Sequence, residues 1–137
     1  MSDRKVLTFV LMDAPFESAR TSTALRLIQT ALDRGHAVNV FAYEGAVALA
    51  FAQQKAHANA VHGCNAQEEN HPLPSTWIAE LIATAAAAGT RLDWVNCGLC
   101  VDERGVNEAV AGVRRGSPVD LWTMAQASDN VLVIATR

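Results

Sequence analysis

The sequence predicts a single α/β domain built on a mainly parallel sheet of about five strands. Short apolar runs of strand length alternate along the chain with segments whose apolar residues recur at helical spacing. The runs are apolar almost throughout, as in strands that are covered by helices on both faces. A chain of 137 residues, half of them hydrophobic, suits one compact domain spanning residues 1–137.

The first part of the chain predicts the order strand, helix, strand, helix. Lys5–Met12 (KVLTFVLM) is a near-continuous apolar run and forms the first expected strand. Ser18–Arg34 has its apolar residues at helical spacing, and Gly35 after it is a typical helix stop. Ala37–Tyr43 (AVNVFAY) is the second expected strand, and the Ala-rich segment Gly45–Gln54 is expected to be helical.

The segment 55–75 is expected to be a mobile insertion, because it combines two prolines with the polar tract NAQEEN. Four candidate metal ligands lie in it: His57, His62, Cys64 and His71. They are most simply solvated loop residues, and the alternative is that one histidine serves as a proton partner for a nearby thiol. Their irregular spacing matches no familiar zinc pattern, so we expect no metal site.

The next part of the chain predicts a helix and a short strand. Trp77–Ala88 is a strong helix former that ends at Gly89, and Leu92–Asn96 has the length of a strand. A helix or an irregular turn is expected to follow through Val113.

The last part predicts a capped helix and a closing strand. Ser117 and Pro118 are typical of an N-cap and a first helical position, and they open a helix over Val119–Ala127. Asp120 adds a capping box. Val131–Ala135 is apolar and is the final expected strand.

The composition argues against several classes of protein. No apolar run reaches the roughly 18 residues of a membrane span, and no export signal is recognisable, so we expect a cytoplasmic protein. The net charge is -3 and the basic residues are scattered, which argues against direct nucleic-acid binding. The loop DAPFESA after the first strand lacks repeated glycines, so we expect no nucleotide or flavin cofactor.

Cys97 follows an expected strand directly, at the edge where open α/β sheets place their ligand crevice. With Cys100 it forms a CxxC pair, a spacing that fits a redox disulfide, half of a zinc site, or a sulfur-handling thiol with a neighbour. The plainer alternative is that both are small buried apolar side chains. A thioredoxin-like protein carries its CxxC after an early strand, which makes that reading less suitable here.

A reactive cysteine needs nearby positive charge, because the thiolate is the nucleophile. The candidates to supply this charge are Arg104, Arg114 and Arg115. Asp102 and Glu103 oppose them if they point the same way, and their ordinary use is at a solvated helix start. The sequence leaves this balance open.

Several other side chains have a structural and a functional interpretation. Asp13 and Glu17 follow the first strand at the edge expected for Cys97, so they either line a pocket there or cap the loop. His36 is expected to be a polar turn residue. The three tryptophans are expected to be core or subunit-interface anchors: Trp77, Trp94 and Trp122.

The segment WVNCGLCVDERGV, with Cys97 seven residues before Arg104, resembles the cysteine signature of the DsrE/TusD sulfurtransferase family. Other family-like stretches are the opening strand with the loop after it, the Arg34-Gly35-His36 turn, the FAYEGAV segment, and Ala127-Ser128-Asp129. The resemblance covers nearly the whole chain.

This resemblance implies a flavodoxin-like three-layer sandwich and a catalytic role for Cys97, which would take sulfane sulfur as a persulfide and pass it to a partner-protein thiol. Cys100 would be a helper or resolving thiol, and no cofactor is expected. The implied partners are a persulfide donor and an acceptor in sulfur oxidation or tRNA thiolation. Assembly is expected with copies of the chain, as a trimer or hexamer, or with sister subunits related to DsrF and DsrH or to TusC and TusB.

Two other functions stay open. One is a non-catalytic oligomeric α/β interaction subunit whose cysteines are structural or bind metal. The other is a dithiol oxidoreductase in which Cys97 and Cys100 cycle as a disulfide. A buried, unreactive Cys97 would favour the first, and a strict requirement for Cys100 would favour the second.

Overall fold

A computed structural model describes residues 3–58, 61, 63–69 and 73–136 and contains one five-stranded sheet. All four neighbouring strand pairs are parallel. In the order of the chain the strands are β1 (Val6–Leu11), β2 (Ala37–Ala42), β3 (Leu92–Cys97), β4 (Val113–Gly116) and β5 (Asn130–Ile134). The predicted parallel α/β domain is therefore confirmed.

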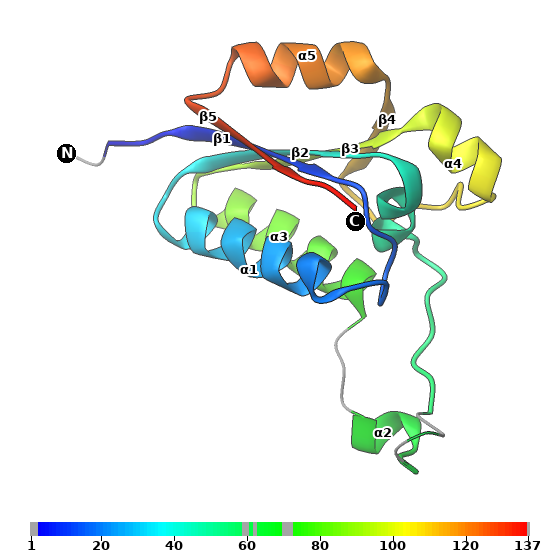
Figure 1. Cartoon of the computed structure of the whole chain (residues 1–137). Helices are drawn as coiled ribbons and strands as arrows, with labels where there is room; N and C mark the ends of the chain where they lie inside the picture. Colours follow the sequence, from blue (N-terminus) through cyan, green and yellow to red (C-terminus); the bar gives the residue numbers. More distant parts are fainter. Residues whose placement is uncertain (1–2, 59–60, 62, 70–72, 137) are drawn as a thin grey trace.

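The helices form layers on both faces of this sheet (Figure 1). They are α1 (Ala19–Asp33), the 3₁₀ helix η1 (Glu44–Ala50), α2 (Ala66–Glu69), α3 (Pro74–Ala87), α4 (Gly98–Arg104) and α5 (Pro118–Gln126). α1 and α3 lie side by side on one face, α5 lies on the other, and α4 stands at the end of the sheet beside η1 (Figure 1). This is the three-layer sandwich that the sequence predicts.

The strand order is β4-β3-β2-β1-β5. Flavodoxin itself has the order 2-1-3-4-5, so the two sheets share layers but not strand order. Here β2, β3 and β4 follow one another on one side of β1, and β5 alone lies on the other side. The direction of winding thus reverses between β1 and β5, and ligand crevices of open α/β sheets form at such points.

Burial of the central strands holds the layers together. All six residues of β2 are buried, and Trp94 of β3 has no exposed surface. The larger core cluster lies between the sheet and α1 and α3, and it includes Leu25, Ile28 and Ile78. A smaller cluster on the α5 side includes Val10, Phe41, Val95, Met124 and Cys97.

Local signals in the sequence fix where two helices begin. Ser18 caps α1, because its hydroxyl accepts a hydrogen bond from the backbone N–H of Arg20. Ser117 and Asp120 form the predicted capping box at α5, with Asp120 accepting from the Ser117 N–H at 2.8 Å. Both predicted helix starts are confirmed.

The expectation of a helix or irregular turn through Val113 is wrong at its end, because Val113–Gly116 is the edge strand β4. This strand carries Arg114 and Arg115 in its middle, so it has none of the apolar pattern by which strands are recognised. Its pairing with β3 positions it instead, with Cys97 opposite Gly116.

Two further differences concern the segment 55–75 and Trp122. The segment contains the short helix α2, which stands apart from the three layers in Figure 1, and its mobility stays a prediction. Trp94 is a core residue and Trp77 packs against the core, as expected. Trp122 is 64% exposed, so a core role for it is wrong.

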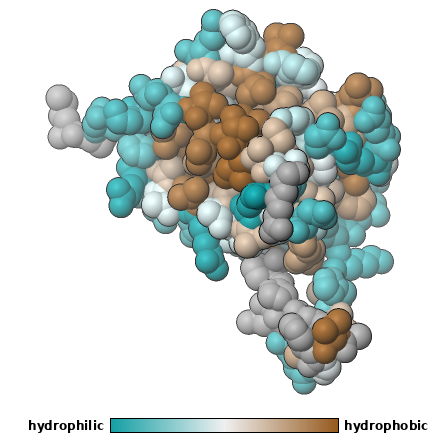
Figure 2. Space-filling model, viewed as in Figure 1, coloured by the Kyte–Doolittle hydropathy of each residue, from teal (hydrophilic) through white to brown (hydrophobic). Residues whose placement is uncertain are grey.

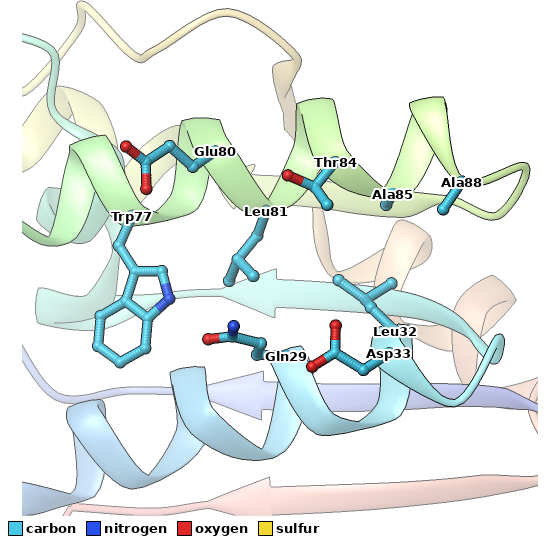
Figure 3. A pocket seen from close by; sticks show the side chains of 9 residues that line it. All are labelled: Gln29, Leu32, Asp33, Trp77, Glu80, Leu81, Thr84, Ala85 and Ala88. Atoms are coloured by element: carbon cyan, nitrogen blue, oxygen red, sulfur yellow. The ribbon is translucent and has the colours of Figure 1, made fainter.

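A cavity of about 510 Å³ lies between α1 and α3 (Figure 3). Leu81 and Leu32 lie within it, and Trp77 of α3 extends toward Gln29 of α1 (Figure 3). No cysteine lines it, so it holds none of the sulfur chemistry that the sequence suggests.

The two tryptophans of opposite burial give a test of the fold. Trp94→Ala should lower the free energy of unfolding by about 3–5 kcal/mol, because it empties a fully buried site. Trp122→Ala should change it by less than about 0.5 kcal/mol, because the side chain is mostly exposed. Urea unfolding followed by circular dichroism measures both, and similar losses for the two variants would contradict this placement.

Candidate functional site

Cys97 lies where β3 turns into α4. It is the last residue of β3 and the N-cap of α4. Its side chain is 8% exposed and packs in the smaller core cluster with Val95 and Val101. The strand thus delivers Cys97 to the carboxyl edge of the sheet, as the sequence predicts, but into a largely enclosed position.

Cys100 lies one helical turn later and contacts Cys97. It is half-buried, and its Sγ accepts a hydrogen bond from the backbone N–H of Glu44 at 3.2 Å. Burial raises the pKa of the Cys100 thiol, and the hydrogen bond with Cys97 raises it further. The structure therefore brings the two cysteines together and favours the protonated form of Cys100.

Glu44 is a part of the site that the sequence analysis missed. Its φ of 51° lies in the left-handed region, which is strained for a residue with a side chain. In this conformation its N–H bonds Cys100, and its carboxylate pairs with Arg104 at 2.9 Å. Glycine or asparagine is the usual sequence signal for a left-handed backbone conformation. A glutamate gives no such signal, so the sequence could not mark this position.

Arg115 is the guanidinium that lies beside Cys97. β4 pairs with β3 so that Arg115 is opposite Asn96. The side chain lies against Gly98, where an added Cβ would be only 2.6 Å from the Arg115 Nε. A glycine directly after Cys97 therefore lets the positive charge approach the strand end.

Asp102 holds Arg115 in this place. Two hydrogen bonds of 2.8 and 2.5 Å join the guanidinium to the two carboxylate oxygens. The pKa of Asp102 is lowered by this partner, and the pKa of Arg115 is raised, first by Asp102 and in smaller part by the negative charge of Cys97. The carboxylate thus orients the guanidinium and also balances its charge.

The other basic candidates have different partners. Arg114 binds Asp93 at 3.0 and 3.1 Å and Asp120 at 3.1 Å, which ties β4 to β3 and α5. Arg104 pairs with Glu44 and, at 3.8 Å, with Glu103. Of the three arginines that the sequence suggests, Arg115 lies against Gly98, directly after Cys97, and Arg104 donates a hydrogen bond to the backbone carbonyl of Cys100 at 3.5 Å.

A cavity of about 780 Å³ opens at the carboxyl ends of β1, β2 and β5, where the winding reverses. Its lining residues are Met12, Asp13, Ala14, Glu17, Ser18, Arg20, Tyr43, Glu44, Gly45, Arg104 and Thr136. The Asp13 carboxylate is buried and accepts a hydrogen bond from Ser18 at 2.6 Å. Asp13 and Glu17 thus line a pocket, and Glu44 connects this pocket to the sulfur of Cys100.

The two histidines that the structure describes, His36 and His57, have partners away from the cysteines. His36 Nδ1 accepts a hydrogen bond from the Lys5 N–H, which fits the predicted turn role. His57 lies edge-on to the ring of Phe16. Among the residues that the structure describes, no group of three or more histidine, cysteine or acidic side chains could hold a metal ion. His62 and His71 lie outside the described residues.

The DsrE/DsrF-like family model matches residues 5–134. The chain belongs to the DsrE/DsrF-like family. Members of this family act in sulfur relays. Two neighbouring cysteines are consistent with this general type of function.

Two archaeal relatives cover most of the chain. The uncharacterized protein MK0008 of Methanopyrus kandleri is 31% identical over 129 residues, 93% of this chain and 92% of the relative. The uncharacterized protein MJ0989 of Methanocaldococcus jannaschii is 28% identical over 127 residues, 91% of this chain and 96% of the relative.

Solved structures share the fold. The YchN protein from E. coli matches with a TM-score of 0.75 at 20% identity, over 96% of this chain and 99% of that one. A conserved protein of unknown function from Bacteroides thetaiotaomicron, BT1422, matches with a TM-score of 0.59 at 14% identity, over 98% of each chain. Within the described residues, no helix has both the length and the apolar character needed to cross a bilayer.

The raised pKa of Cys100 predicts how its alkylation depends on pH. In the Cys97→Ser variant, which leaves one cysteine in this segment, the rate should still be rising above pH 8.5, the ordinary thiol pKa. In the wild type its midpoint should be higher still, because Cys97 contributes to the shift. Peptide mass spectrometry after iodoacetamide pulses measures both profiles, and a midpoint below that of a free cysteine would contradict the placement.

Proposed function

We propose that this chain is a sulfur carrier that holds sulfane sulfur as a persulfide on Cys97 and passes it to a thiol of a partner protein. Family membership supports a sulfur-relay function as a class. The observation that carries the finer proposal is the grouping of Cys97, Cys100 and Arg115 at the carboxyl edge of the sheet. Such sulfur transfer requires a reactive thiol and a docking surface on the protein, and it needs no cofactor.

Loading is an exchange of one sulfur–sulfur bond for another. The Cys97 thiolate attacks the outer sulfur of a donor persulfide, a new bond forms between Cys97 Sγ and that sulfur, and the donor's own sulfur–sulfur bond breaks. The electron pair leaves with the donor thiolate, which takes up a proton. No external oxidant or reductant is needed.

Delivery repeats this step in the opposite sense. A thiolate of the acceptor protein attacks the outer sulfur, and the Cys97 thiolate is the leaving group. Because a persulfide extends the side chain by one bond of about 2 Å, the acceptor meets the outer sulfur rather than the buried Cys97 Sγ.

Arg115 would stabilise the negative charge that Cys97 carries as thiolate and as persulfide anion. Its guanidinium is held beside the strand end by Asp102, so it needs no reorganisation when charge develops. Asp102 is therefore a positioning residue, while Arg115 acts on the sulfur directly.

Cys100 would be a helper thiol. Its raised pKa favours the protonated thiol, which can donate a hydrogen bond to the sulfur of Cys97. It also has the position of a resolving thiol, because attack on Cys97 Sγ would form a Cys97–Cys100 disulfide and release the carried sulfur as hydrosulfide. That second use corresponds to the dithiol oxidoreductase.

The partners in this proposal are proteins. A persulfide donor and an acceptor dock at the carboxyl edge, and the chain assembles with its own copies, as a trimer or hexamer, or with sister subunits of the same family. The pathway would be sulfur oxidation or tRNA thiolation in the cytoplasm, where thiols stay reduced.

The low exposure of Cys97 favours a second candidate function. A thiol that is 8% exposed and packed among apolar side chains is typical of a structural cysteine. In that case the chain is a non-catalytic α/β interaction subunit, and its cysteines stay unmodified by sulfur donors.

Intact-mass spectrometry after incubation with polysulfide distinguishes the candidates. The wild type should gain one or more increments of about 32 Da, Cys97→Ser should gain none, and Cys100→Ser should keep at least part of the gain.

Two other outcomes have a definite meaning. An unmodified Cys97, under conditions that load a known persulfide carrier, would contradict the proposal and favour the structural subunit. A Cys100→Ser variant that loads on Cys97 but releases no sulfur to any thiol would favour the dithiol oxidoreductase.

Arg115 and Arg114 form a matched pair for testing the electrostatic step. Arg115→Ala should slow the loading of Cys97 on the order of tenfold, because it removes the positive charge beside the sulfur. Arg114→Ala should leave the rate within about twofold, because that side chain binds Asp93 and Asp120 instead. The loading rates come from quenched mass spectrometry, and equal rates for both variants would remove Arg115 from the mechanism.

A further inference from the structure

The cavity of about 780 Å³ at the carboxyl ends of β1, β2 and β5 takes no part in the sulfur transfer proposed above, because neither Cys97 nor Cys100 lines it. Its volume is in the range of sites that bind small molecules. It also lies where the winding of the sheet reverses, which is the usual place for a ligand in an open α/β fold. The charged groups in its wall indicate what kind of molecule fits.

Asp13 contributes a buried carboxylate with one oxygen available to a ligand. The residue is 7% exposed. Its Oδ2 accepts the hydrogen bond from Ser18 and lies 4.0 Å from the guanidinium of Arg20. Within the described chain, no hydrogen bond or ion pair reaches Oδ1. Because a buried carboxylate oxygen without a partner is costly, this atom favours a ligand that brings a hydrogen-bond donor, above all a cationic one.

Arg20 contributes a guanidinium whose donors are not used. The Asp13 oxygen at 4.0 Å is beyond hydrogen-bond distance, and no hydrogen bond among the described residues involves the Arg20 side chain. On its other side Arg20 borders apolar side chains of β5, including the exposed Leu132 and Val133, which lie in the apolar patch over this strand (Figure 2). None of the residues that line this side is acidic. The guanidinium is therefore available to a carboxylate of a ligand, which it can bind through two parallel hydrogen bonds.

The charges in the wall of the cavity fit a zwitterion. Arg104, the other arginine there, is paired with Glu44 at 2.9 Å. The available groups are thus the cation of Arg20 and the acidic side formed by Asp13 and Glu17. In an α-amino acid one carbon atom separates the ammonium from the carboxylate, so one small head group can meet both Asp13 and Arg20. A simple anion would meet the two carboxylates as well, and like charges repel.

One wall of the cavity leads to the cysteines. Tyr43 and Glu44 line the cavity. Tyr43 packs against the core cluster that contains Cys97, and the Glu44 N–H donates to Cys100 Sγ at 3.2 Å. The side chain of a bound amino acid that points toward this wall therefore faces the cysteine site. A ligand that carries sulfur itself has the chemistry to use this position.

We propose that this cavity binds a small sulfur-bearing α-amino acid of the cysteine type, with its ammonium at Asp13 Oδ1 and its carboxylate at Arg20. As a persulfide, such a molecule is a small-molecule sulfur donor for Cys97, beside the protein donor. This donor role rests on the proposed function, whereas the binding of the head group does not. In the transfer, the outer sulfur forms a bond with Cys97 Sγ and the sulfur–sulfur bond of the donor breaks. The electron pair leaves with the thiolate of the free amino acid, which takes up a proton.

Isothermal titration calorimetry with S-methyl-L-cysteine tests the binding site, because this probe has the head group and a sulfur atom but cannot transfer sulfur. The probe should bind the wild type. Asp13→Asn and Arg20→Ala should each weaken binding about tenfold or more, since each removes a charged hydrogen-bond partner. The matched controls are Asp33→Asn and Arg26→Ala, which remove the same charges from positions of α1 outside the cavity. Both controls should bind the probe like the wild type.

Two relatives of the probe test the head group. N-acetyl-S-methyl-L-cysteine lacks the ammonium and S-methylcysteamine lacks the carboxylate, so each should bind the wild type about tenfold more weakly or worse. A wild type that does not bind S-methyl-L-cysteine would overturn the proposal. Because Asp13→Asn also removes the partner of Ser18 and risks disturbing the loop, the half-exposed Arg20 gives the decisive variant. An Arg20→Ala protein that binds the probe like the wild type would also overturn the proposal.

Quenched mass spectrometry tests the donor role by comparing two loading rates of Cys97, one from cysteine persulfide and one from inorganic polysulfide. The ratio of the first rate to the second should fall about tenfold in Arg20→Ala and stay unchanged in Arg26→Ala. Polysulfide has no head group, so a Cys97 that it never loads would contradict the sulfur carrier and not the binding site. Normal loading by polysulfide with an unchanged ratio in Arg20→Ala would instead overturn the donor role and leave the sulfur carrier in place.

Discussion

The requirement that every strand of the sheet be parallel determines the rest of this structure. A chain that returns to start each strand in the same direction must cross a face of the sheet, so helices cover both faces and β2 is buried at all six residues. The same requirement collects the carboxyl ends of all strands at one edge. Glu44, Cys97 and Arg115 are far apart in the sequence and meet there for this reason.

The chemistry at this edge depends on pairs of opposite charge rather than on isolated ones. Arg115 with Asp102 and Arg104 with Glu44 flank the two cysteines, and each arginine is positioned by its carboxylate. A guanidinium that is already neutralised attracts a thiolate less strongly than a free one, but it stays in place. In the proposed mechanism such pairs would give a fixed, moderate stabilisation of negative charge on sulfur, which suits a carrier that both accepts and releases sulfur.

The sequence was sufficient wherever a local pattern determines the structure. The apolar runs of β1, β2 and β3, the helical spacing after Ser18 and the capping residue Ser117 predicted elements that the structure contains. Cys97 was placed at a strand end because a short apolar run precedes it directly.

The sequence was insufficient wherever tertiary contacts decide. β4 is charged and is a strand only because β3 pairs with it. Glu44 has an unfavourable backbone conformation that its bonds to Cys100 and Arg104 stabilise, and no local signal marks it. Trp122 shows the same limit, since composition alone cannot say on which side of α5 a large aromatic residue lies.

The position of β5 also has a consequence for how the domain is made. Among the described strands β5 is the last to be synthesised, and it pairs with the first, so the hydrogen bond from Val6 to Asp129 spans 123 residues. During translation, the edge of β1 that pairs with β5 stays unpaired until β5 has been synthesised. Contacts between residues so far apart in the sequence also form slowly. Once formed, this outermost strand is also the part of the sheet from which fraying would begin. Whatever covers the edge of β5 therefore also governs how often the finished sheet opens.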